Sequence, residues 1–89
     1  MKAEYVFEHR RGRFNVCLTD DDAIELSLYG VVRKRCEFSG REPQYVWTNV
    51  ELEWEEHHYI EVRYWSVDDR LQIIANRTPI YEGALVHRN

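Results

Sequence analysis

The residues best suited to bind a metal ion stand side by side in the chain: Glu55, Glu56, His57 and His58. Histidine nitrogens and carboxylate oxygens are common zinc ligands, but a zinc site requires ligands that converge on one point. Consecutive residues of an extended chain point to opposite sides, and no other histidine or cysteine is linked to this segment by its spacing. We therefore expect a solvated loop here and no bound metal.

Other candidate sites each lack a part that their chemistry requires. The acidic run at positions 20–22 has oxygen ligands for calcium but lacks the glycine and the distal glutamate of a calcium loop. Cys17 and Ser27 could act as nucleophiles, but the strand pairing derived below places no histidine base beside either of them. Glu53 and Glu61 form a carboxylate pair on the outside of a hairpin, where no cleft is indicated. We therefore expect no enzymatic activity and no cofactor.

A more informative group of side chains is aromatic and basic. If Cys36 pairs with Val46, then Arg35 lies opposite Trp47, and Tyr45 lies next to Trp47 on the same outer face. Aromatic rings with basic neighbours hold single-stranded nucleic acid, and the same residue types are enriched at protein interfaces. This face is therefore a candidate binding surface.

A further pairing would lengthen this surface. If Asn49 lies opposite Trp65, then Tyr45, Trp47 and Trp65 form one aromatic strip. A contiguous strip of this kind on the surface of a monomer is a candidate contact site. It could also mediate a homodimer, as could an open sheet edge. The alternative is that residues 66–89 fold back over the strip and cover it.

The charge distribution indicates what kind of partner would bind. Residues 1–41 carry a formal balance of +1 and residues 42–89 a balance of −5. The acidic half contains a predicted hairpin with four glutamates, which are Glu51, Glu53, Glu55 and Glu56. An acidic surface disfavours phosphate backbones, so nucleic acid is an improbable partner, and it favours a basic protein. The alternative is that the charge serves solubility alone.

The elements that would position these residues are strands, because apolar and polar residues alternate along most of the chain. A two-residue loop at Arg11-Gly12 would set Phe7 opposite Val16, and an acidic turn would set Val16 opposite Leu26. Both pairings place every apolar partner on one face. These expected buried residues are Tyr5, Phe7, Phe14, Val16, Leu18, Ile24, Leu26 and Leu28.

Later segments continue the alternation. Gly30 interrupts a pattern that runs from residue 24 to residue 38, and we expect it to bend one long strand at a corner. A three-residue loop at positions 56–58 would pair Val50 with Tyr64 in a second hairpin. Residues 71–75 fit a strand after a turn at 68–69, with a short helix as the alternative.

Together these patterns predict one all-β domain over residues 1–89, built as a small meander-type barrel or two-layer sandwich of six to seven strands. No apolar run is long enough for a membrane helix. The start of the chain lacks the apolar stretch of a signal peptide. With two cysteines, Cys17 and Cys36, we expect reduced thiols and a cytoplasmic location.

The function that these features favour is a non-enzymatic protein-interaction module of the inhibitor, immunity or adaptor type. It would use the aromatic strip, the neighbouring Arg35 and the acidic hairpin. The alternative is a small β-barrel that binds a small ligand, an oligosaccharide or a single nucleic-acid strand on the same aromatic face.

Overall fold

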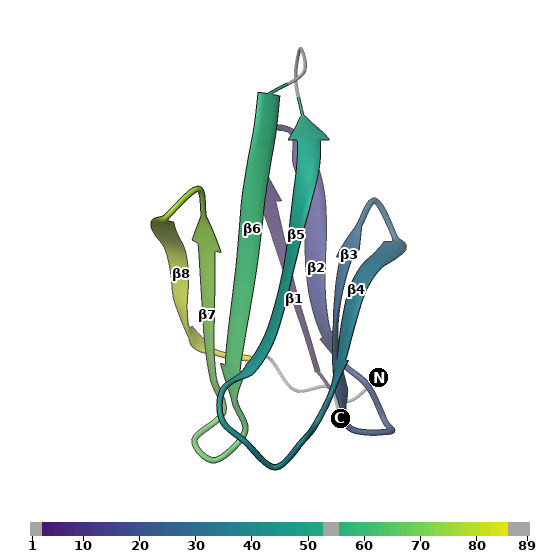
Figure 1. Ribbon diagram of the computed structural model, residues 1–89, viewed down its shortest axis with the longest axis vertical. Helices are drawn as coiled ribbons and strands as arrows, with labels where there is room; N and C mark the ends of the chain where they lie inside the picture. The colour runs from purple at the N-terminus through teal and green to yellow at the C-terminus, as the bar shows by residue number, and fades with distance from the viewer. Residues whose placement is uncertain (1–2, 53–55, 86–89) are drawn as a thin grey trace.

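The computed structural model describes residues 3–52 and 56–85. They form eight antiparallel strands and, in the described part of the chain, no helix (Figure 1). The strands are β1 (Ala3–His9), β2 (Gly12–Leu18), β3 (Ala23–Leu28), β4 (Val31–Glu37), β5 (Gln44–Leu52), β6 (Glu56–Trp65), β7 (Arg70–Ala75) and β8 (Thr78–Ala84). The all-β prediction is confirmed, while the predicted count of six to seven strands is too low.

The strands form two four-stranded sheets in the orders β1-β2-β3-β4 and β5-β6-β7-β8, and the structure is not a closed barrel. The two sheets face each other around one apolar core (Figure 1). Each sheet contributes alternate residues, since successive side chains of a strand point to opposite faces. The largest fully buried side chains are Phe14, Ile24, Leu26, Ile60, Leu71, Ile73, Leu85, Val16, Val50 and Val62.

The buried face predicted for the first three strands is confirmed. Phe7, Phe14, Val16, Leu18, Ile24 and Leu26 are buried, and Tyr5 and Leu28 are partly buried against the same core. The pairing of Val16 with Leu26 across β2 and β3 is also as predicted. Aligned apolar faces on neighbouring strands specify the register, because a slip of one residue would turn the whole face to water.

The predicted register between β1 and β2 is wrong by two residues. Phe7 lies opposite Phe14, because the two-residue turn is made by Arg10 and Arg11 and not by Arg11-Gly12. Gly12 begins β2 instead, opposite His9. A two-residue slip leaves the same side chains on the same face, so alternation could not distinguish the two registers.

The Arg10-Arg11 turn should be a source of strain that substitution can relieve. Both residues have positive φ, 50° and 65°, a region that costs a non-glycine residue roughly 1–2 kcal/mol. We expect Arg10→Asn with Arg11→Gly, the preferred pair for such a turn, to stabilise the protein by about 1 kcal/mol in urea denaturation.

The matched control is the double variant Arg10→Ala with Arg11→Ala, which removes the same two charges but keeps the steric cost of positive φ. It should not become more stable than the native chain. Equal stability of the two double variants would contradict the strain argument.

Gly30 does not bend a long strand. Tyr29 and Gly30 form a two-residue turn with φ of 51° and 79°, so the predicted strand is two antiparallel strands, with Leu28 opposite Val31. Gly30 supplies the positive φ that this tight turn requires. The chain instead passes from the first sheet to the second through residues 38–43.

The last hairpins of the two sheets follow the same plan. β3, its turn and β4 correspond to β7, its turn and β8 at an offset of 47 residues, although no corresponding positions carry the same residue type. Both hairpins contain a bulge at the same place, where the register leaves Arg33 of β4 and Ile80 of β8 without an opposite residue. Such bulges hinder the addition of another strand. The edge strands β4 and β8 are therefore poor templates for another strand.

The second predicted hairpin exists, but its register differs. Val50 lies opposite His58 and not Tyr64. Residues 56–58, predicted as the loop, begin β6, and the tip at 53–55 lies outside the described residues. The shift is by an even number of residues, so Ile60 and Val62 still face the core. Residues 71–75 belong to a strand, as predicted, and not to a helix.

Candidate functional site

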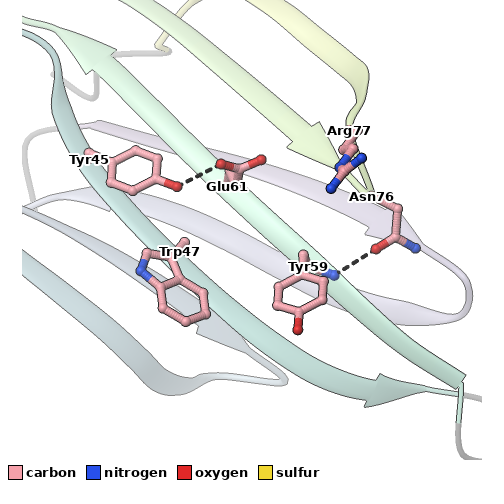
Figure 2. Close-up of a pocket in the computed structure, with 6 residues that line it drawn as sticks. All are labelled: Tyr45, Trp47, Tyr59, Glu61, Asn76 and Arg77. Atoms are coloured by element: carbon pink, nitrogen blue, oxygen red, sulfur yellow. Dashed lines mark hydrogen bonds between the residues drawn. The ribbon is translucent and has the colours of Figure 1, made fainter.

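Three large aromatic side chains lie exposed on the outer face of the second sheet. Tyr45 and Trp47 come from β5 and Tyr59 from β6, at odd-numbered positions whose even-numbered neighbours enter the core. Their exposed fractions are 38%, 46% and 51%. The rings of Trp47 and Tyr59 are tilted by 35° with centroids 6.3 Å apart. We call these three residues the aromatic face (Figure 2).

The aromatic face borders a shallow hollow of about 530 Å³ that also contains polar groups. Glu61 of β6 and the turn residues Asn76 and Arg77 complete its lining (Figure 2). The side-chain oxygen of Asn76 accepts a hydrogen bond of 2.8 Å from the backbone N–H of Tyr59. This bond holds the β7–β8 turn beside β6.

The end of the hollow at Tyr45 is polar and charged. The Tyr45 hydroxyl donates a 2.6 Å hydrogen bond to the carboxylate of Glu61, and the guanidinium of Arg63 lies 5.0 Å from the Tyr45 ring centre. Partial burial, followed by the Glu61 carboxylate, raises the pKa of Tyr45 above its ordinary value. Tyr45 therefore keeps its proton and can present a polar hydroxyl and a flat ring together.

These groups are suited to binding. Flat rings offer apolar contact area, and the carboxylate, amide and guanidinium around them can form hydrogen bonds. The described residues contain no group of three or more side chains that could hold a metal ion.

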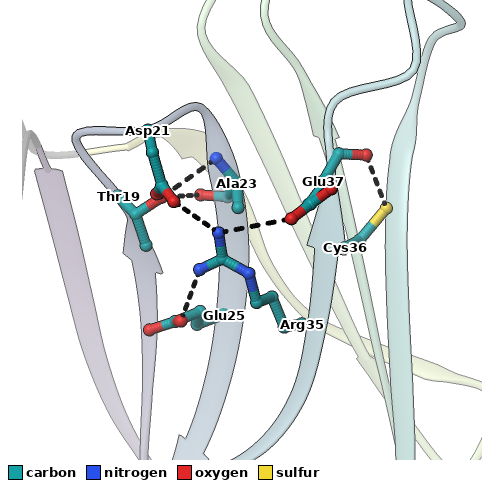
Figure 3. Close-up of polar contacts among 7 residues, drawn as sticks. All are labelled: Thr19, Asp21, Ala23, Glu25, Arg35, Cys36 and Glu37. Atoms are coloured by element: carbon teal, nitrogen blue, oxygen red, sulfur yellow. Dashed lines mark hydrogen bonds and ion pairs between the residues drawn. The ribbon is translucent and has the colours of Figure 1, made fainter.

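The structure does not place Arg35 in this site. Its guanidinium bonds to Glu25 at 2.7 Å and to Asp21 at 2.8 Å on the first sheet, with Glu37 at 3.8 Å (Figure 3). The predicted pairing of β4 with β5 is wrong, because β4 pairs with β3 in the other sheet. Lys34 approaches Trp47 instead, with Nζ 5.8 Å from the ring centre.

Trp65 is on the same outer face of β6, beyond the residues that pair with Tyr45, Trp47 and Asn49. The guanidinium of Arg70 lies 4.0 Å from its ring centre, and Asn49 pairs with Tyr59 and not with Trp65. The aromatic strip therefore differs from the prediction, since Tyr59 replaces Trp65 beside Trp47. The signal for Tyr59 is the alternation of β6, in which the even-numbered residues Ile60 and Val62 face the core.

Two of the four predicted acidic residues are described. Glu51 is the next-to-last residue of β5 and Glu56 begins β6, and both are exposed at one end of the hairpin. Glu53 and Glu55 lie outside the described residues.

A buried histidine supports the same end of the sheet. His58 is buried, and the Asn76 amide nitrogen donates to its Nδ1 at 2.9 Å. The Asn76 oxygen accepts from the backbone of Tyr59, which leaves the amide nitrogen to face His58. Nε2 of His9 lies 3.1 Å from the same Nδ1, and the two imidazole rings are in edge contact. His58 therefore connects β1, β6 and the turn that lines the hollow.

Among the described residues, no helix is long and apolar enough to span a membrane. No protein-family model matches this chain, and no curated protein or solved structure matches it.

Proposed function

We propose that this protein is a non-enzymatic protein-interaction module, of the inhibitor, immunity or adaptor type, that binds its partner through the aromatic face. The observation that carries the proposal is the exposure of three adjacent large aromatic side chains on a small domain. The segment expected to cover them does not do so within the described residues. Residues 70–84 form β7 and β8 in the same sheet, alongside β6.

The chemistry of the aromatic face supports this proposal. Tyr and Trp supply much of the binding energy at protein interfaces, and the polar residues around them match the usual polar rim. The exposed carboxylates of Glu51 and Glu56 lie at one end of the same hairpin, and the chain carries a net charge of −4. A basic partner would therefore be attracted and oriented by charge. Cys17 and Cys36 are not joined in a disulfide, which agrees with a cytoplasmic setting.

Paired affinity captures from the native cell lysate test this proposal. The bait is the native chain, the double variant Trp47→Ala with Tyr59→Ala, or the control Tyr29→Ala, which removes an exposed aromatic from the first sheet. We expect a partner that the native chain and the control retain and the double variant loses. Its affinity should fall at least tenfold, because truncated hot-spot residues typically cost roughly 2 kcal/mol or more.

Added salt should also weaken the complex if the partner is basic. If the double variant captures every specific partner as well as the native chain, the aromatic face is not the binding site.

A second copy of the chain is the simplest partner. It could use the aromatic face or an edge strand without a bulge, which restricts the edge to β1 or β5. Sedimentation at micromolar concentration decides this, since a 10.8 kDa species alone would exclude self-association. A dimer that survives Trp47→Ala would assign the contact to an edge.

A small-ligand function is favoured by one specific observation, the polar lining of the hollow beside flat rings. A sugar ring could stack on Trp47 or Tyr59 while its hydroxyls bond to Glu61, Asn76 or Arg77. A single nucleic-acid strand could stack on the same rings. Saturable quenching of tryptophan fluorescence by an oligosaccharide or an oligonucleotide, lost in Trp47→Ala, would support this function over the first.

A further inference from the structure

A second hollow is lined by residues of β4 and β5. These strands lie on the neighbouring sides of the two sheets (Figure 1). Residues 31–34 of β4 and 47–49 of β5 line it, and its volume is about 550 Å³. We call it the seam groove. The two strands that border it are sheet edges, because within the described residues β4 pairs with β3 alone and β5 with β6 alone.

The two edges differ in their ability to accept another strand. β4 is bulged at Arg33, which disrupts a regular row of backbone donors and acceptors. β5 pairs with β6 over residues 44–52 without a register shift. The other edge of β5 therefore presents a regular row of backbone N–H and C=O groups. An unpaired regular edge is a template to which an extended peptide can add. An incoming strand would therefore pair with β5.

The β4 side of the groove offers apolar contact. Val31 and Val32 are 65% and 49% exposed, although strand valines usually pack against neighbours. Val31 lies opposite Leu28, whose side chain packs against the core, so Val31 is on the inward side of the sheet. A peptide side chain in the groove would cover this exposed valine.

The charge of the groove is positive and not neutralised. Arg33 and Lys34 line it, and no acidic residue is part of its lining. Neither side chain forms an ion pair with the described residues, and Lys34 only approaches the ring of Trp47. Arg35, by contrast, is surrounded by carboxylates on the outer face of the first sheet (Figure 3). The two positive charges in the groove therefore have no carboxylate partner among the described residues.

We propose that the seam groove binds an extended acidic segment of a partner protein, which adds as a strand to the free edge of β5. Its backbone pairs with β5 and its carboxylates contact Arg33 and Lys34. Apolar side chains of the segment pack against Val31 and Val32. This surface is distinct from the aromatic face, with which it shares only Trp47.

The probe is a fluorescent peptide of about eight residues, an ordinary strand length, in which glutamate and valine alternate. Fluorescence anisotropy should show saturable binding to the native chain and much weaker binding of the matching lysine–valine peptide. Arg33→Glu with Lys34→Glu should weaken binding at least tenfold. The control Arg10→Glu with Arg11→Glu makes the same change in net charge at an exposed turn and should leave the affinity within twofold.

Backbone methylation of the peptide tests strand addition itself. Methyl groups on alternate amide nitrogens should abolish binding when those N–H groups face β5 and should be tolerated when they face away. If the peptide tolerates both methylation patterns, it does not add as a strand to β5. Equal binding of the lysine–valine peptide, equal loss in both double variants, or no binding by a folded native chain would overturn the proposal. Because Trp47 lines both hollows and Tyr59 only the first, the single variant Tyr59→Ala separates the two sites: it should leave peptide binding unchanged and weaken the partner of the aromatic face.

Discussion

Replacing Leu26 by alanine should lower the free energy of unfolding by about 2–5 kcal/mol, the usual range for a large-to-small change in a packed core. Leu26 is completely buried on β3, where it lies opposite Val16 of β2 and Lys34 of β4. Neighbouring strands hold its surroundings in place, so the space left by the side chain cannot collapse fully. Urea denaturation followed by tryptophan fluorescence measures the loss.

The control for Leu26 is Val67→Ala, which shortens an apolar side chain in the exposed loop between β6 and β7. That variant should stay within about 0.5 kcal/mol of the native chain. Ile73, at the corresponding position of the second sheet, should behave like Leu26 because it is also completely buried. A loss below about 1 kcal/mol for Leu26→Ala would contradict a single core shared by the two sheets.

His58→Ala should cost about 2–4 kcal/mol, the second largest effect that we expect. The substitution opens a buried space between β1 and β6 and removes the ring that the Asn76 amide and the His9 ring both contact. The lost hydrogen bond adds to the cost of the buried space, because the Asn76 amide loses its partner on β6. The turn that lines the hollow beside the aromatic face would lose one of the three hydrogen bonds that Asn76 makes to β6.

The neighbouring histidine provides the matched control for His58. His57 is exposed on the opposite face of β6, so His57→Ala should change stability by less than about 0.5 kcal/mol. A double-mutant cycle between His9 and His58 should give a coupling energy of about 0.5 kcal/mol or more, because the two rings are in contact. Equal effects of His57→Ala and His58→Ala would contradict the bonding around His58.

The core face of the first three strands was predictable because apolar residues recur there with the period of two that a strand imposes. Phe14, Val16 and Leu26 are buried as expected. The same rule placed Tyr45 and Trp47 outside. Burial of one face depends on local alternation and does not depend on which partner strand lies alongside.

Registers were harder to predict because they depend on turns whose residues carry weak signals. The first hairpin turns at Arg10 and Arg11, two residues disfavoured at positive φ, and the neighbouring Gly12 was the more plausible turn residue. In the second hairpin, residues 56–58 belong to β6 and not to a loop, in part because His58 can be buried. Its hydrogen bonds to Asn76 and His9 come from elements far away in the chain.

By itself, then, the sequence determined the fold class, the inward face of most strands and the exposure of Tyr45 and Trp47. Only the tertiary structure decided that Gly30 closes a hairpin, so that β4 joins the first sheet and Arg35 leaves the predicted site. It also brought Asn76 and Arg77 beside Tyr59 and placed Lys34 near Trp47. The physical reason is that alternation reflects which side chains of a strand face water and which face the core. The pairing of distant strands depends instead on the packing of the whole chain.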